Sequence, residues 1–170
     1  MKKLQFNRRG ITLVELLIVL AIFGIVTQTI YSIFFVGNKS YNMSKNKGFI
    51  QQDVRIAADF INRELRIVKD IAKDQNVLEE KYYSLSVEEG KLVKTMFNGE
   101  ISEESIPLSG TLKGIKFNYV HGDVKGIVTV IIEAEENGEA YSLKFNVLLE
   151  NLPRYDNPID QNIIYYSKYE

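Results

Sequence analysis

Residues Gly10 to Val26 read GITLVELLIVLAIFGIV, and this stretch decides the fold. The run continues to Val36 with only small or neutral polar interruptions, apart from one carboxylate at Glu15. As a helix, residues 11–36 would be roughly 39 Å long at about 1.5 Å per residue, which exceeds the roughly 30 Å hydrocarbon core of a bilayer. We therefore predict a transmembrane helix there. A carboxylate at that depth costs about 2.5–3.5 kcal/mol, so Glu15 indicates a function.

The sequence before this run is short and basic. MKKLQFNRRG ends at Gly10 and contains four positive residues: Lys2, Lys3, Arg8 and Arg9. Such charges favour a cytoplasmic N-terminus, although three lysines that follow the span weaken that bias. Three other kinds of segment share some of these features. A secretory signal has a shorter apolar core followed by a small-residue cleavage site. A plain signal anchor does not need Glu15, and a buried core helix is shorter and lacks a basic leader.

This segment resembles the prepilin processing site of the type IV pilin and pseudopilin superfamily. The resemblance rests on the basic leader and on Gly10, Thr12-Leu13 and Glu15, which lie in register with the apolar run. The resemblance implies that residues 1–10 are a leader, which a prepilin peptidase removes by cutting between Gly10 and Ile11. The same enzyme would then methylate the new amine of Ile11. The resemblance also implies that Glu15 pairs with the N-terminal amine of a neighbouring subunit during assembly. A protonated Glu15 that snorkels is the alternative.

The same resemblance sets expectations for location and partners. It implies a single-pass cytoplasmic membrane protein with its N-terminus in the cytoplasm, which is later built into an extracellular pilus or pseudopilus. The implied partners are prepilin peptidase, other pilins in a helix bundle, and the cytoplasmic membrane. Major pilins commonly carry a proline part-way along this helix, whereas Thr29–Ile33 has none. That difference favours a minor subunit.

Composition excludes several other classes of protein. The chain has 170 residues, enough for one membrane helix and one small domain. Its formal net charge is −1, and loss of the four leader charges leaves 17 basic and 22 acidic residues, or −5, which argues against a general nucleic-acid binder. There are no cysteines, and the single histidine, His121, lies in a predicted Gly/Asp turn. No catalytic, small-molecule, cofactor or metal motif is present, so we expect no enzyme.

The remaining sequence predicts a pilin-like α+β domain over residues 49–152. Residues 37–48 are polar with a glycine at each end, and predict a flexible juncture. Apolar residues then recur at spacings of three and four from Ile50 to Ala72, which predicts an amphipathic helix that ends at Asp74-Gln75-Asn76. From Tyr82 the period switches to two, with turns at Glu89-Gly90, Asn98-Gly99 and Asn137-Gly138. An antiparallel sheet packed on the helix follows.

Residues 153–170 contain Pro153 and Pro158, and are predicted to form an irregular tail. Four oxygen donors cluster there, which leaves calcium binding as an alternative to solvated turn residues: Asp156, Asn157, Asp160 and Asn162. The tail ends with Tyr165, Tyr166 and Tyr169. These tyrosines are interpreted either as an adhesive or partner-binding surface or as a strand that packs on the core.

The order of elements also resembles the minor pseudopilins and minor pilins of the J and W type. The resemblance rests on Arg63-Glu64-Leu65 in the helix and on the alternation of Ile115, Phe117 and Tyr119. We therefore expect a minor pilin or pseudopilin of a type IV pilus or a type II secretion-like filament. The alternatives are a major pilin, an adhesion or DNA-uptake receptor displayed on the filament, and a pseudopilin that drives protein secretion.

Overall fold

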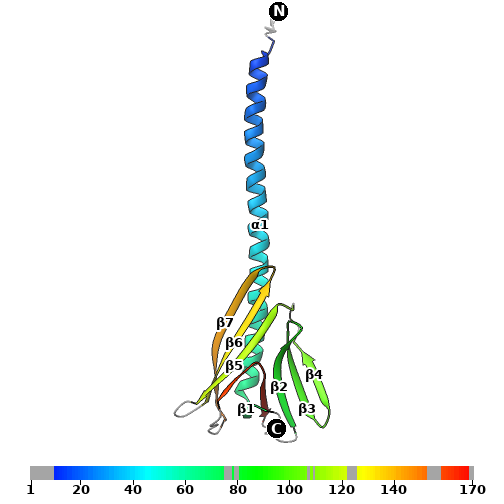
Figure 1. Cartoon of the computed structure of the whole chain (residues 1–170), viewed down its shortest axis with the longest axis vertical. Helices are drawn as coiled ribbons and strands as arrows, with labels where there is room; N and C mark the ends of the chain where they lie inside the picture. The colour runs from blue at the N-terminus through cyan, green and yellow to red at the C-terminus, as the bar shows by residue number, and fades with distance from the viewer. Residues whose placement is uncertain are drawn as a thin grey trace, which may run out of the picture. The chain divides into compact units, whose positions relative to one another are not determined.

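The computed structural model describes residues 10–74, 78, 81–106, 108, 110–121, 126–152 and 158–168. One long helix, α1 (Leu13–Arg66), precedes all of the strands (Figure 1). The chain divides into two compact units, Met1–Met43 and Ser44–Glu170, and α1 contributes to both. An N-terminal helix followed by antiparallel sheets is the α+β architecture that the sequence predicts.

In the first unit, α1 is apolar and its side chains are exposed. Three hydroxyls interrupt the apolar run, and each donates a hydrogen bond to the carbonyl four residues earlier: Thr27 to Phe23 at 2.8 Å, Thr29 to Ile25 at 2.9 Å and Ser32 to Gln28 at 2.9 Å. A polar group in hydrocarbon is costly unless it is satisfied within the helix. These hydroxyls are therefore compatible with a membrane span.

Residues 37–48 are helical, so the predicted break in the helix is wrong. Gly37 and Gly48 each cost about 1 kcal/mol relative to alanine, but the other residues of the segment cost less. Helix nucleation is the expensive step, whereas adding residues to an existing helix is cheap. Because strong helical sequence lies on both sides, the helix continues through the segment.

The predicted end of the helix is also wrong. α1 ends at Arg66, and Val68–Ala72 form strand β1 instead of further helical turns. Val68, Ile71 and Ala72 are fully buried in that strand. The spacing from Leu65 to Val68 and Ala72 satisfies a helical pattern by coincidence. Residues 68–72 form a strand because they pair with residues 165–168, and local periodicity does not report such distant pairing.

Two antiparallel sheets follow, where the sequence predicted one. The first has the order β1-β9-β2-β3-β4 and the second β7-β6-β5-β8. The strands not yet defined are β2 (Lys81–Glu88), β3 (Lys91–Asn98), β4 (Ile101–Ser105), β5 (Leu112–His121), β6 (Gly126–Glu136), β7 (Glu139–Leu149), β8 (Ile159–Gln161) and β9 (Ile164–Lys168). Turns join β2 to β3, β3 to β4 and β6 to β7 where the sequence predicted them.

The prediction that residues 153–170 form an irregular tail is wrong, because β8 and β9 lie within this segment. Ile159, Ile164 and Tyr166 have no exposed surface, and their burial outweighs the effect of the two nearby prolines. Pro158 precedes β8 instead of interrupting it, which is a position that proline tolerates. Residues 153–157 lie outside the described residues.

The core forms where one face of α1 meets both sheets. Within Ser44–Glu170, Figure 1 shows β5–β7 to the left of the C-terminal part of α1 and β2–β4 to its right. Val54, Ala57, Ile61 and Leu65 have no exposed surface and belong to one apolar cluster with residues from both sheets. Phe117 and Tyr119 of β5 and Val128 and Val130 of β6 are in this cluster, and Phe145 of β7 packs against it. The predicted packing of the helix stripe is confirmed.

One buried junction ties α1 to the sheets. The Thr111 hydroxyl donates to the Asp53 carboxylate at 2.9 Å, while the Glu135 N–H donates to the Thr111 carbonyl at 2.9 Å. Next to it, Gly90 has a φ of +77°, and a Cβ added there would lie 2.2 Å from the Gly110 carbonyl oxygen. Both the backbone conformation and the available space therefore require glycine at this turn.

Candidate processing and assembly site

The predicted cleavage bond joins two exposed residues just before α1. Gly10 and Ile11 lie outside the helix, and Ile11 is 76% exposed. A Cβ added at Gly10 would meet nothing within 4 Å. The fold therefore does not require glycine at this position, so any strict requirement for Gly10 would come from a molecule that acts on the chain. The leader residues 1–9 lie outside the described residues.

Thr12 forms the N-terminal cap of α1. The Glu15 N–H donates to the Thr12 Oγ1 at 3.2 Å, and the Leu16 N–H donates to the Thr12 carbonyl at 3.2 Å. Thr12 thus occupies the N-cap position and Glu15 the third helical position, the Thr-x-x-Glu spacing of a capping box. This role of Thr12 was not predicted from the sequence, although the spacing of the two residues is sufficient to find it.

Glu15 lies in the first turn of α1, a few residues after Gly10 and Ile11. A carboxylate is favourable there because the first N–H groups of a helix are unpaired and the helix dipole is positive at this end. Glu15 is also the only charged residue from Ile11 to Val36. The site therefore places one acid at the start of an otherwise uncharged helix. A cationic amine is its natural complement in a medium of low dielectric constant.

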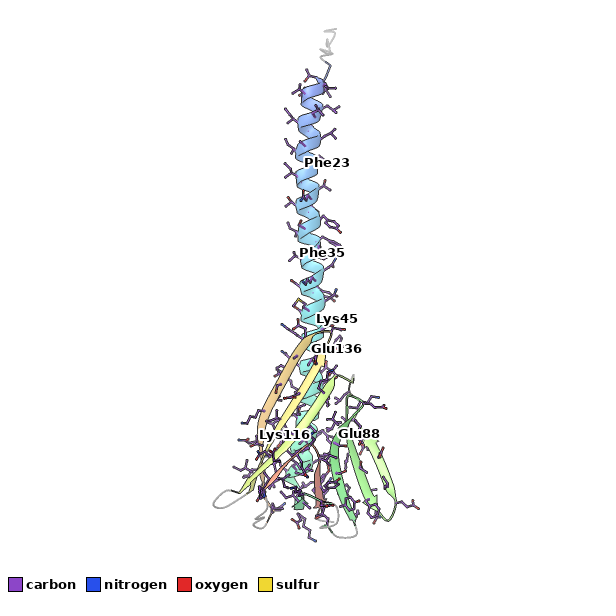
Figure 2. All side chains as sticks on the ribbon, viewed as in Figure 1. Phe23, Phe35, Lys45, Glu88, Lys116 and Glu136 are labelled. Carbon is purple, nitrogen blue, oxygen red and sulfur yellow. The ribbon has the colours of Figure 1, made fainter. Side chains whose placement is uncertain are left out.

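The helix that carries Glu15 meets the requirements for a membrane span by length and composition. Its most apolar 18-residue window has a mean hydropathy of 2.3, and none of that window is buried inside the structure. Figure 2 shows side chains projecting from several sides of this part of α1, around Phe23 and Phe35. A core helix of a soluble protein would bury one of these faces, so the exposed apolar surface needs lipid or other helices around it.

Several described residues that were candidates for calcium or partner binding lie within strands, as does His121. Tyr166 is buried in the core, whereas Tyr165 packs edge-on against Tyr82 with ring centroids 6.2 Å apart. Asp160 pairs with Lys116 at 3.0 Å. His121 is the last residue of β5 instead of a turn residue. Asp156, Asn157 and Tyr169 lie outside the described residues, and the part that is described contains no group of three or more acidic, histidine or cysteine side chains that could hold a metal ion.

Comparison with known proteins identifies the N-terminal segment. A family model described as the prokaryotic N-terminal methylation motif matches residues 5–27, which include Gly10, Ile11 and Glu15. The chain therefore carries an N-terminal methylation motif, which supports a type IV pilin- or pseudopilin-like protein. The match does not reach the residues that resemble the J and W type. No curated protein and no solved structure matches the chain.

Proposed function

We propose that this pilin-like chain is a minor subunit of a type IV pilus or pseudopilus. Prepilin peptidase cuts between Gly10 and Ile11 on the cytoplasmic side and methylates the Ile11 amine. The apolar part of α1 first anchors the chain in the cytoplasmic membrane and then enters a helix bundle with other subunits. The domain of residues 44–170 faces outward. The chain acts as a structural component and not as an enzyme.

The observation that carries the proposal is the position of Glu15. The methylation motif matches residues 5–27, and the helix that follows is exposed and apolar with this single acid in its first turn. An unpaired carboxylate in a low-dielectric bundle is costly, and the cationic amine of Ile11 on an adjacent subunit offsets much of that cost. Because only one axial offset brings the two groups together, the pair selects the register between neighbouring subunits.

The minor role is supported by a feature of α1. No proline interrupts the helix, which runs without a break from Leu13 to Arg66. Major pilins commonly have a proline in this region, so its absence favours a subunit present in few copies. Quantitative mass spectrometry of sheared filaments tests this point. A minor subunit is expected at a small fraction of the most abundant pilin, whereas a major pilin would itself be the most abundant chain.

The assembly role is tested with three substitutions of Glu15, comparing the membrane and sheared-filament fractions of each variant. Glu15→Val removes both the charge and the polar side chain but keeps the backbone N–H that donates to Thr12, and should still insert in the membrane and be cleaved. Glu15→Gln keeps a side chain that can complete the capping box but removes the charge. Glu15→Asp keeps the charge with a shorter reach. Under the proposal, the Glu15→Val and Glu15→Gln variants are absent from the filament fraction or fail to start filaments. The Glu15→Asp variant is intermediate.

The glutamine variant separates the two roles of Glu15. If Glu15→Gln assembles as well as the parent chain while Glu15→Val fails, then a polar side chain at this position and not the charge is required. If Glu15→Val also assembles normally, the carboxylate is not the assembly contact. A subunit at the very tip has no neighbour on one side, so it is expected to show a milder loss than a subunit in the shaft.

A further inference from the structure

The last strand that the structure describes, β9, lies inside a sheet and not at its edge. β9 pairs with β1 on one side and with β2 on the other, both antiparallel. Within the described residues, β1 pairs with no strand other than β9. β2, β3 and β4 follow one another along the chain and can pair as successive hairpins. The five-stranded sheet therefore becomes continuous only when residues 164–168 lie between β1 and β2.

The place that β9 occupies is specific for its side chains. Ile164 lies opposite Leu85, and Tyr166 lies opposite both Tyr83 and Ile71. Ile164, Tyr166, Leu85 and Ile71 have no exposed surface. The rings of Tyr83 and Tyr166 are stacked, with centroids 5.5 Å apart and an interplanar angle of 23°. A strand at this place must therefore present an aliphatic side chain and, two residues later, an aromatic one.

A cluster of charges joins β9 to the end of α1. One carboxylate oxygen of Glu64, Oε2, lies 2.6 Å from the Lys168 Nζ and accepts a hydrogen bond of 2.7 Å from the Tyr166 hydroxyl. The other oxygen, Oε1, lies 3.5 Å from the Lys94 Nζ of β3. The Lys168 and Lys94 ammonium groups also lie 4.9 Å and 5.3 Å from the centroid of the Tyr83 ring. We call these five residues the Glu64 cluster.

The Glu64 cluster is largely shielded from water, which strengthens its interactions. The side chains of Glu64, Lys94 and Lys168 are only 14–16% exposed. Burial by itself would raise the pKa of Glu64, but hydrogen bonds from Lys168 and Tyr166 and the two lysine charges hold that pKa below its ordinary value. Burial, with the negative charge of Glu64, raises the pKa of Tyr166, so the phenol stays protonated and donates.

We propose that the space between β1 and β2 is a strand-binding site for the chain's own C-terminus, and that binding of residues 164–168 there is the step that completes the domain. Glu64 recognises the strand by pairing with Lys168 and Tyr166, which are 102 or more residues away in sequence. Because a chain is made from its N-terminus, β9 is the last described element to become available. The β2–β4 hairpins and β5, β6 and β7 can pair beforehand, but within the described residues β2–β4 are joined to β1 only through β9.

Hydrogen exchange of the full chain in membranes or micelles tests the role of Glu64. Glu64→Gln removes the charge with little change in shape, and Glu103→Gln is the matched control because that exposed acid on β4 lies outside the Glu64 cluster. Glu64→Gln should speed amide exchange in β9 and β1 by at least about tenfold and leave β6 and β7 unchanged. A uniform rise across both sheets, or no rise at all, would overturn the proposal.

Strand binding is tested by supplying the C-terminus separately. A chain that ends at Asn162 should be protease-sensitive in β1 and β2–β4, and a synthetic peptide of residues 163–170 should restore resistance. The same peptide with Lys168→Glu should bind at least about tenfold more weakly, because it places two acids together. A shortened chain that resists protease as the parent does would contradict the proposal. Equal rescue by both peptides would contradict the role of Glu64.

Discussion

Leu65 offers the sharpest test of the packing between α1 and the sheets. Its side chain has no exposed surface and belongs to the core cluster of residues 44–170. Leu65→Ala removes three carbon atoms from that core. At about 0.8 kcal/mol per buried CH₂, the lost transfer free energy is about 2.4 kcal/mol. The cavity left behind adds to this, so we expect a total loss of about 2–5 kcal/mol in the free energy of unfolding.

The assay is thermal unfolding of a fragment that begins at Ser44, followed by circular dichroism. For a domain of this size, 1 kcal/mol shifts the Tm by about 3–6 °C, so Leu65→Ala should lower the Tm by about 6–30 °C. Ile67→Ala is the control, because Ile67 is 50% exposed, and should lower the Tm by much less. Equal effects of both substitutions would refute the packing described for α1. A purely helical spectrum of the parent fragment would refute the α+β fold itself.

Three further predictions concern the same domain. Gly90→Ala should destabilise it by more than Gly99→Ala in a denaturant titration, because only at Gly90 would the new Cβ collide with backbone, 2.2 Å from an oxygen. Since Glu64 has a folded-state pKa below its ordinary value of 4.5, its stabilising effect should be full at neutral pH and be lost as the pH falls below that value; Glu64→Gln should reduce this acid sensitivity in pH-dependent unfolding. Thr111→Val should leave the buried Asp53 without that hydrogen bond and lower the free energy of unfolding by about 1–3 kcal/mol, with Thr129→Val as the exposed control.

Local signals in the sequence were sufficient for much of the fold. The apolar run of residues 11–36 predicted a helix because a run of this length and composition is typical of a helix that spans a membrane. Glycine after asparagine or glutamate placed three turns, since these residues tolerate the backbone that a tight turn needs. Alternation around Phe117 located β5 because one of its faces is buried and the other is not.

The errors arose where distant residues decide the structure. β1 resembles the last turn of a helix until β9 pairs with it, and β9 lies almost a hundred residues further along the chain. Residues 37–48 have weak helix propensity, but the helices on both sides extend through them. The tail was predicted to be irregular from its prolines, whereas buried isoleucine and tyrosine side chains make it part of both sheets.

The candidate site could be located from the sequence, but its surroundings could not. Gly10, Ile11 and Glu15 lie within one short stretch of the chain, so a linear motif is sufficient to find them. The cap formed by Thr12 was also readable from the spacing of two residues. The Glu64 cluster combines residues from α1, β2, β3 and β9. No single stretch of sequence contains that arrangement, so only the folded chain reveals it.

The most direct test of the central claim is the mass of the mature N-terminus. The protein is isolated from membranes and from sheared filaments, and its N-terminal peptide is sequenced by mass spectrometry. The account predicts a chain that begins at Ile11 with one added methyl group on its amine. Gly10→Glu should leave the precursor uncut, whereas Gly37→Ala, at another glycine with open space around it, should be processed normally. Filaments that contain the chain beginning at Met1 would contradict the account.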